Sequence, residues 1–292
     1  MNEITYSFII PHKNSPNMLS RCIKSIPERD DIQVIVVDDN SCAENKPTSN
    51  RLDVKIIFLD SKLSNGAGHA RNVGLDYATG KWLLFADADD FYNEGFLNVL
   101  DNYKDTNYDV VYFNFDYKDG KSGINLPPMK WSKIYTNYDG SKEACDRMRF
   151  CNKVPWTKMV RKSYIDKFCI KFEEVPNGND IYFSLMVGFY SDNFIVEKKH
   201  LYAYLKNDNS LVNKKTNFDG LLCRLLHRIQ LNSFYEFIGH SSWRVSVIKL
   251  IFHYSIDTGF VFLFRVLPKL RDLYIHKNEW IMNLNTQNKI RR

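Results

Sequence analysis

The chain has 292 residues, 44% hydrophobic and 25% charged, a composition typical of a globular protein with one large or two small cores. Its six cysteines are scattered without a C-x-x-C pair, which argues against a disulfide framework or a structural zinc site and favours a cytosolic compartment. The net charge of +6 is uneven: residues 213–292 hold 13 Lys/Arg against 5 Asp/Glu, and residues 1–212 hold 27 against 29. The N-terminus lacks the basic and apolar stretches of a signal peptide.

Strand-like and helix-like segments alternate through the first 115 residues. Apolar runs predict strands at Tyr6–Pro11, Ile32–Val37, Val54–Leu59, Trp82–Phe85 and Val110–Phe115. Helical spacing predicts helices at Asn17–Ile26, Gly66–Ala78 and Glu94–Tyr103. This alternation predicts a mostly parallel sheet that is covered by helices on both faces.

The remaining residues are expected to be less regular at first and then helical. Residues 116–150 include Gly120, Gly123, Pro127 and Pro128 and predict an irregular connection with an edge element. A helix-like segment follows at Ile181–Phe189, and the pattern is helical and basic from about residue 217 onward. We find no internal repeat and no low-complexity tract.

Polar residues follow three of the predicted strands: His12–Asn14, Asp38–Ser41 and Asp87–Asp90. Ligands of such sheets bind beyond the carboxyl ends of the strands, so one cleft could hold all three segments. Asp87, Asp89 and Asp90 would repel one another, and a divalent cation such as Mg²⁺ or Mn²⁺ would relieve that repulsion. For an isolated Asp-x-Asp, the simpler interpretation is a solvated turn.

Four motifs in order resemble those of family 2 glycosyltransferases of the GT-A fold, the bacterial enzymes of capsule, O-antigen and lipooligosaccharide assembly. They are an apolar strand with Pro-x-x-Asn at Ser7–Asn14, Val-Asp-Asp-x-Ser at Val37–Ser41, Ala-Arg-Asn-x-Gly within Asn65–Gly74, and the acidic run Asp87–Asp90. The glycine-rich turn at Gly66–Gly68 lacks the Walker and dinucleotide fingerprints, so it gives no reason to invoke ATP or NAD.

Weaker similarity extends to about residue 212. Pro155–Lys158 resembles the Trp-x-Lys of the acceptor-side region, and Gly178–Asp180 stands where many relatives have Gly-Glu-Asp. Tyr202–Tyr204 with Asn209–Ser210 resembles the segment that closes the catalytic domain. Two departures are Lys13, which replaces the usual aromatic residue, and Asn179, which replaces the usual Glu and removes one carboxylate.

The resemblance implies an α/β fold of the GT-A type, with a Rossmann-like, mostly parallel sheet flanked by helices and a C-terminal helical region. Residues 1–212 would form the catalytic domain, with a nucleotide-sugar-binding half at 1–115 and an acceptor-side half at 116–212. Residues 213–292 would form the basic helical region.

The resemblance also implies an inverting, metal-dependent transfer of a hexosyl or N-acetylhexosaminyl group from a nucleotide-sugar, which we expect to be a UDP-sugar. The acceptor would be a bacterial surface polysaccharide or a lipid-linked oligosaccharide. The nucleotide-sugar would contact six residues: Pro11, Asn14, Asp39, Arg71, Asp87 and Ala88. Asp89 would bind Mn²⁺ or Mg²⁺, Asp180 would be the catalytic base, and Trp156 and Lys158 would frame the acceptor.

Several of these residues also have structural interpretations. Arg71 could be a helix-surface arginine, Asp180 an N-cap and Trp156 a core residue. At the level of function, the rival interpretations are a non-catalytic sugar-nucleotide-binding or scaffold protein of the same fold and a sugar nucleotidyltransferase. The latter class would show a Gly-rich, Arg-containing signature near the first strand, and residues 9–20 do not.

The basic C-terminal region has two interpretations of equal weight. Trp243–Arg271 mixes aromatic and aliphatic residues with cations, which fits an amphipathic helix on anionic lipid at the inner face of the cytoplasmic membrane. The alternative is a helical subdomain, and the charges inside Val245–Leu267 make it a poor membrane-spanning helix. A homodimer also remains open, whereas nucleic-acid binding is the weakest idea.

Overall fold

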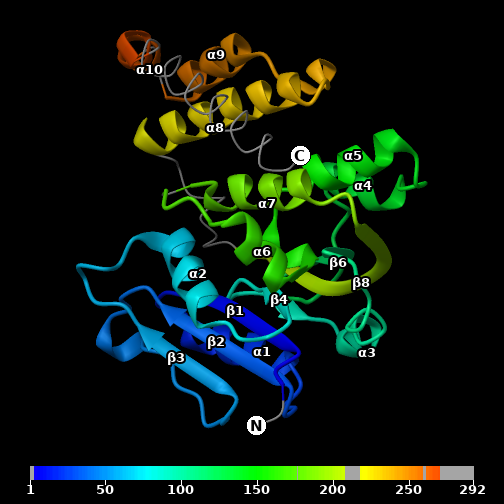
Figure 1. Ribbon diagram of the computed structural model, residues 1–292. Helices are drawn as coiled ribbons and strands as arrows, with labels where there is room; N and C mark the ends of the chain where they lie inside the picture. Colours follow the sequence, from blue (N-terminus) through cyan, green and yellow to red (C-terminus); the bar gives the residue numbers. More distant parts are fainter. Residues whose placement is uncertain (1–2, 176, 208–217, 259–260, 270–292) are drawn as a thin grey trace. The chain divides into compact units, whose positions relative to one another are not determined.

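The computed structural model describes residues 3–175, 177–207, 218–258 and 261–269. The chain divides into two compact units, the first made of residues 1–175 and 179–213 and the second of residues 176–178 and 214–292 (Figure 1). Each unit is described by itself below. The segment Asn209–Ser210 and the residue Arg271 lie outside the described residues.

The first unit is built on one eight-stranded sheet with the order β3-β2-β1-β4-β7-β6-β8-β5. Its strands are β1 (Tyr6–His12), β2 (Ile32–Asp38), β3 (Val54–Phe58), β4 (Trp82–Phe85), β5 (Phe91–Tyr92), β6 (Val110–Asp119), β7 (Lys158–Arg161) and β8 (Phe194–Lys206). The first four strands run parallel, as predicted, and α-helices connect β1 to β2 and β3 to β4. β7 is antiparallel to β4 and β6, and β6 pairs in parallel with β8.

Helices cover this sheet because each has an apolar or small-residue face. They are α1 (Pro16–Ser25), α2 (Gly66–Tyr77), α3 (Phe96–Leu100), α4 (Lys133–Thr136), α5 (Lys142–Cys151), α6 (Lys162–Phe168) and α7 (Asn179–Tyr190), with 3-10 turns η1 (Ala43–Asn45), η2 (Lys130–Ser132) and η3 (Pro155–Thr157). α2 lies close on β1 (Figure 1), since a Cβ at Gly74 would come within 2.4 Å of Ile9 Cγ2. This close approach fixes where the N-terminus of α2 meets the strand ends.

The prediction of an irregular connection at residues 116–150 was wrong in part. β6 continues to Asp119, and two helices, α4 and α5, follow. α5 is capped by Ser141, whose side chain accepts a hydrogen bond from Ala144 N. Its buried face includes the charged residues Asp146 and Arg149, so the hydrophobic pattern did not show the helix.

The predicted helix at Glu94–Tyr103 is shorter in the structure. α3 begins at Phe96 because Gly95 before it adopts a left-handed backbone conformation with φ of 73°. The helix-like segment predicted at Ile181–Phe189 is longer, since α7 starts at Asn179. Asp180 therefore lies inside the first turn of α7 and not at the N-cap position.

The second unit is helical in its described part, as the pattern from residue 217 predicted. It contains α8 (Phe218–Phe237), η4 (Ser241–Trp243), α9 (Val247–Thr258), α10 (Val261–Val266) and η5 (Leu267–Lys269). Leu221, Leu225, Ile251, Phe262 and Val266 form its buried core. Across the described residues, no helix combines the length and the apolar character that crossing a bilayer requires.

Candidate functional site

The ends of β1, β2 and β4 meet at one edge of the sheet. His12 is in register with Asp38, and Ile9 is in register with Phe85, so the segments that follow these strands are neighbours. The parallel pairing thus brings together the three polar segments singled out in the sequence. This edge is the candidate active site of the first unit.

A buried pair at this edge was missed by sequence reasoning. His12 Nε2 accepts a hydrogen bond from Ser15 N at 3.1 Å, so Nδ1 donates to Asp38 Oδ1 at 2.7 Å. The hydroxyl of Ser41 also donates to Asp38. The only signal in the sequence was a titratable residue at the end of each of two strands. Because His12 and Asp38 are both buried, they hold the two strand-end loops together.

Asp39, which we expect to contact the nucleobase, directly follows β2, and its side chain reaches the N-terminus of α2. Its Oδ1 accepts hydrogen bonds from Asn65 N at 3.1 Å and Gly66 N at 3.3 Å, as an anion at a helix N-terminus does. Its Oδ2 accepts from Lys13 Nζ at 3.1 Å. Lys13, one of the departures from the family pattern, is therefore a partner of Asp39.

Asn14 and Pro11 form the neighbouring wall. Asn14 adopts a left-handed conformation with φ of 53°, which Asn tolerates better than most residues. Its Oδ1 accepts from Cys42 N at 2.9 Å, and its backbone N donates to Ser41 Oγ at 2.8 Å. Pro11 is half-buried at the end of β1. Asn14 thus fixes the loop after β2 beside Asp39.

The acidic run divides into three different environments. Asp90 is 0% exposed and accepts hydrogen bonds from Tyr202 Oη at 3.0 Å and Leu205 N at 2.8 Å, both from β8. Burial raises the pKa of Asp90 well above its usual value. Asp87 N donates to the same Tyr202 Oη at 3.0 Å. Asp90 therefore ties the run to β8 and does not face solvent.

Asp87 is joined to α7 through Arg71. Arg71 Nη2 donates to Asp87 Oδ1 at 2.6 Å, and Nη1 donates to Asn179 Oδ1 at 2.8 Å. The alternative of a surface arginine is wrong, because Arg71 is 6% exposed. Its buried Nε has no hydrogen-bond partner. Ala88, which follows Asp87, is buried and contributes no polar side-chain atom to the site.

Asp89 is half-buried beside Asp87. Its Oδ2 accepts from Asn207 Nδ2 at 3.0 Å, and its carbonyl oxygen accepts from Arg21 Nη2 at 2.6 Å. Burial, and then the neighbouring Asp87 carboxylate, raise the pKa of Asp89. Within the described residues, no group of three or more His, Cys, Asp or Glu is arranged to hold a metal ion alone. The donor set fits Mn²⁺ or Mg²⁺ if substrate phosphate oxygens complete the coordination.

Asp180 lies next to Asn179, in the first turn of α7. The carboxyl is half-buried, and burial raises its pKa while the nearby Arg71 guanidinium opposes that rise. A carboxylate with a raised pKa is suited to accept a proton near neutral pH. Because Arg71 bonds both Asp87 and Asn179, it places Asp180 close to the acidic run.

Trp156 and Lys158, the predicted acceptor residues, lie below the surface of this edge. Trp156 is 4% exposed and stacks on Tyr202 and Tyr204 with ring centroids 4.9 and 5.4 Å apart. Lys158 is 0% exposed, and its Nζ donates to Asn152 O at 3.0 Å and to Val154 O. Burial lowers the pKa of Lys158 to about 7. The rings around Trp156 come from β8, whereas the carbonyl partners of Lys158 lie six and four residues before it.

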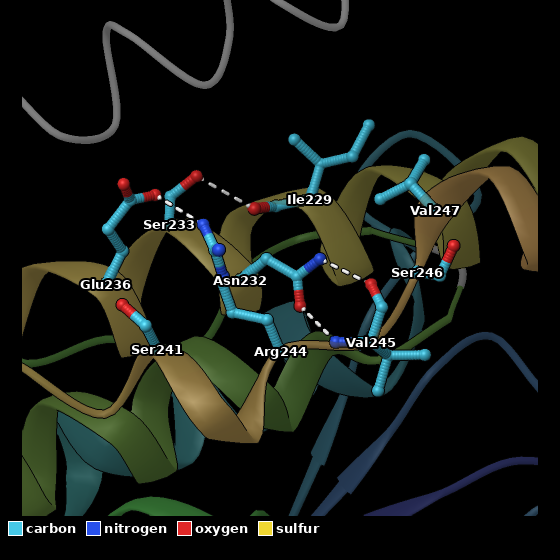
Figure 2. A pocket seen from close by; sticks show the side chains of 9 residues that line it. All are labelled: Ile229, Asn232, Ser233, Glu236, Ser241, Arg244, Val245, Ser246 and Val247. Atoms are coloured by element: carbon cyan, nitrogen blue, oxygen red, sulfur yellow. Dashed lines mark hydrogen bonds and ion pairs between the residues drawn. The ribbon is translucent and has the colours of Figure 1, made fainter.

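A separate cavity of about 420 Å³ lies in the second unit between α8 and the start of α9 (Figure 2). Its polar side chains bond mainly to one another or to nearby backbone. Asn232 Nδ2 donates to Val245 O at 2.7 Å, and Val245 N donates to Asn232 Oδ1 at 2.9 Å. Arg244 pairs with Glu236 at 3.1 Å. These bonds fix the 241–246 segment on α8.

Comparison with known proteins decides the family. Residues 7–168, more than half of the chain, match the sequence profile of glycosyl transferase family 2. The chain belongs to this family. The matched stretch contains the strand-end motifs, Arg71 and the acidic run. The strand-end part of the candidate site therefore lies within the stretch that defines the family.

Individual relatives are bacterial. The chain is similar to the glycosyltransferase GlyA of Streptococcus pneumoniae, with 26% identity over 218 residues, covering 70% of this chain and 31% of GlyA. It is also similar to the GalNAc(5)-diNAcBac-PP-undecaprenol beta-1,3-glucosyltransferase of Campylobacter jejuni, with 35% identity over 114 residues and 37% of each chain covered. The family 2 chain thus spans only about a third of the length of each of these two relatives.

A solved structure supports the GT-A fold. The crystal structure of Staphylococcus aureus TarS 1-349 in complex with UDP-GlcNAc has a TM-score of 0.58, covering 95% of this chain and 81% of that chain at 19% sequence identity. A likeness at this identity shows the shared fold. TarS is a poly(ribitol-phosphate) beta-N-acetylglucosaminyltransferase, and a stretch of 97 residues is 33% identical, covering 30% of this chain and 17% of TarS.

Proposed function

We propose that this chain catalyses the inverting, metal-dependent transfer of a hexosyl or N-acetylhexosaminyl group from a UDP-sugar. The acceptor is a hydroxyl group of a bacterial surface polysaccharide or lipid-linked oligosaccharide. One observation carries the proposal: the Arg71 guanidinium bonds Asp87 at 2.6 Å and Asn179 at 2.8 Å, joining the acidic run to the helix of Asp180. The relatives that act on undecaprenol-linked saccharide and on poly(ribitol phosphate), and the UDP-GlcNAc complex of TarS, support the same reaction.

The donor nucleotide binds at the strand ends. Asp39 keeps lone pairs beyond its bonds to Asn65, Gly66 and Lys13, so its carboxylate accepts a hydrogen bond from the base, as from a uracil imide. Pro11 and Asn14 form the wall beside the base. Asp87 contacts the ribose, and the buried Arg71 directs positive charge toward the diphosphate.

Asp89 would hold the cation, with the diphosphate oxygens of the donor supplying further ligands. Mn²⁺ or Mg²⁺, when bound, supplies Lewis-acid stabilisation of the leaving diphosphate. Burial and the neighbouring Asp87 carboxylate raise the pKa of Asp89. A bound cation would stabilise the ionised form of Asp89 and so oppose this rise. Asn207 orients the Asp89 carboxylate from the end of β8.

Asp180 removes the proton of the acceptor hydroxyl. Inversion is a single displacement, so one carboxylate must accept that proton as the oxygen attacks the anomeric carbon. The acceptor approaches over the acceptor-side half, where Trp156 and Lys158 shape the site from beneath. Arg71 joins Asp87 of the acidic run to Asn179, the neighbour of the base Asp180. This link sets the distance between the base and the place where the donor diphosphate binds.

Replacing Asp89 by Ala tests this function. We expect UDP-sugar turnover to fall about 100-fold, because the cation loses its carboxylate. The control is Asp105→Ala, since the Asp105 side chain is 83% exposed and lies outside the site. Turnover is measured as UDP release with and without acceptor, and with excess EDTA. Full activity in EDTA or in Asp89→Ala would contradict metal dependence, and absence of turnover with every UDP-sugar would favour the non-catalytic scaffold.

We also propose that the enzyme works at the inner face of the cytoplasmic membrane as a peripheral protein. The exposed face of α9 supports this placement: Ile248, Phe252 and Ile256 follow one another at intervals of four residues and are 72%, 55% and 76% exposed. Cationic residues accompany this face, including Arg244 and Lys249. Such a combination is typical of helices that lie on anionic lipid.

A further inference from the structure

A groove separates α4 from α5 in the acceptor-side half, with a cavity volume of about 300 Å³. Trp131, Lys133 and Asn137 line one side, and Ala144, Arg147 and Cys151 line the other. On α5 these residues recur at intervals of three and four, so they share one helix face. The groove is therefore the seam between two facing helices.

Charged and polar side chains line this seam beside the apolar side chains of Trp131 and Ile134. Facing helices are normally sealed by large apolar side chains. Here the eight lining residues include three cations, Lys130, Lys133 and Arg147, and no carboxylate. Glu143 outside the lining pairs with Arg147 at 2.7 Å, which leaves a positive balance. This balance stands out because residues 1–212 hold 27 Lys/Arg and 29 Asp/Glu.

A series of ring contacts, one edge-to-face and one stacked, connects the groove to the candidate active site. Trp131 contacts Trp156 with ring centroids 6.1 Å apart, and Trp156 stacks on Tyr202 at 4.9 Å. The Tyr202 hydroxyl accepts a hydrogen bond from Asp87 N. Trp131 is stacked on Phe115 at 5.0 Å and is half-buried, so part of its indole stays open to the groove. The groove thus begins two ring contacts from the tyrosine that holds the acidic run.

We propose that this groove binds a negatively charged unit of the acceptor chain, next to the unit that receives the sugar. The inference rests on the proposed glycosyl transfer and names its acceptor class: a saccharide or polyol chain bearing carboxylate or phosphate groups. Lys130, Lys133 and Arg147 attract the anionic group, and Arg147 suits the two oxygens of a carboxylate or phosphate. The open part of the Trp131 indole packs against the apolar face of the chain.

The test compares binding of charged and neutral probes by titration calorimetry. The probes are a hexuronic-acid tetrasaccharide with its carboxyl-reduced form, and a ribitol-phosphate tetramer with ribitol. The test variant carries Lys130→Glu with Lys133→Glu, and the rescue variant carries Arg at both positions. The matched control carries Lys24→Glu with Lys55→Glu. Lys24 lies in the last turn of α1 and Lys55 near the start of β3, both away from the strand-end edge, and both are exposed.

We expect the wild-type enzyme to bind one anionic probe about tenfold or more tightly than its neutral counterpart, with the difference shrinking as salt is added. The test variant should lose that preference, and the rescue and control variants should keep it. Which of the two anionic probes binds shows whether the groove recognises a carboxylate or a phosphate group. Equal binding of charged and neutral probes by the wild type, or an unchanged preference in the test variant, would overturn the proposal.

A separate readout distinguishes this proposal from the proposed function. UDP should raise the thermal unfolding temperature of all four proteins equally, because the groove lies outside the donor site. If UDP binding and turnover fail while the charge preference holds, the donor chemistry is wrong and the groove assignment stands. If UDP turnover holds and the preference is absent, the groove assignment alone is wrong.

Discussion

The contacts of Arg71 show how the residue at position 179 affects the charge of the candidate site. It bonds Asp87 and Asn179, and its buried Nε lacks a partner. A buried donor left unsatisfied costs about 1–3 kcal/mol, so a bound anion would recover this energy. A glutamate at position 179 would neutralise the guanidinium further. Asn179 accepts the hydrogen bond without adding charge, so under the proposed function more of the Arg71 charge would be available to the diphosphate.

Asp180→Asn tests the base. The variant keeps the side-chain shape but cannot accept the proton, so turnover should fall about 100-fold or more while UDP-sugar affinity is retained. Because burial raises the pKa of Asp180 and the base must be ionised, wild-type turnover should fall with decreasing pH earlier than for an ordinary aspartate. This acidic limb of the kcat profile should be absent from the residual activity of Asp180→Asn. A loss of only a few-fold would place the base elsewhere.

Asp90→Asn tests the structural role of the third carboxylate. An amide NH₂ would replace one acceptor oxygen and face either Tyr202 Oη or Leu205 N, both of which donate to Asp90. We expect the free energy of unfolding in urea to drop by about 1–3 kcal/mol. The exposed Asp105→Asn should change it by no more than about 0.5 kcal/mol. Equal stability of the two variants would show that Asp90 is not held as described.

The sequence identified which residues gather at this edge but not how each one is used. Asp87, Asp89 and Asp90 are chemically identical in the printed chain. Their environments differ because Tyr202 and Leu205 come from a strand more than a hundred positions later. Lys158 differs, since the carbonyls that receive its Nζ, those of Asn152 and Val154, are near it in the chain; its burial is unexpected because a lysine is usually exposed.

At the scale of elements, local apolar runs predicted β1 to β4 to within about one residue, because buried parallel strands need little from distant partners. The pattern failed where the partners are distant. In β8, which spans thirteen residues, the charged stretch Glu197–His200 hides the strand. In α5, Arg149 is buried because its Nε donates to Gly188 O at 2.8 Å on α7.

Gly188→Ala tests the contact between α5 and α7. A Cβ at position 188 would lie 2.2 Å from Arg149 O, a backbone atom that moves only with its helix. We expect the variant to lose about 1–3 kcal/mol of unfolding free energy in denaturant titration, since overpacking forces the helices apart. Ser163→Ala, at an exposed position of α6, is the control and should stay within about 0.5 kcal/mol. A stable Gly188→Ala protein would mean that the two helices are not in close contact.

At the scale of the whole molecule, the charge is divided between the two parts of the chain. Residues 213–292 hold 13 Lys/Arg and 5 Asp/Glu, and the excess of acidic residues in 1–212 is small. We expect liposome co-sedimentation to increase with anionic lipid content and decrease with salt, because each cation near an anionic surface contributes about 1 kcal/mol.

Two variants separate the contributions to membrane binding. Lys249→Glu with Lys269→Glu should weaken co-sedimentation, and Phe252→Ser should weaken it by removing an apolar side chain that is 55% exposed. The control, Lys24→Glu with Lys55→Glu, should sediment like the wild type. Turnover on a soluble acceptor should be unchanged in all of them. If the wild-type protein does not co-sediment with anionic liposomes at low salt, the second unit is better interpreted as a helical subdomain or subunit interface.

The position of α4 and α5 in the chain has a consequence for how such enzymes diversify. β6 and β7 are hydrogen-bonded neighbours, with Tyr112 opposite Lys158, yet the chain leaves the sheet after Asp119 and returns at Lys158. Both helices of the groove belong to this excursion, while the donor motifs belong to residues 7–90. We therefore expect that grafting residues 120–151 from a relative, with the α5 contact to Gly188 kept, transfers acceptor preference while the sugar donor stays the same.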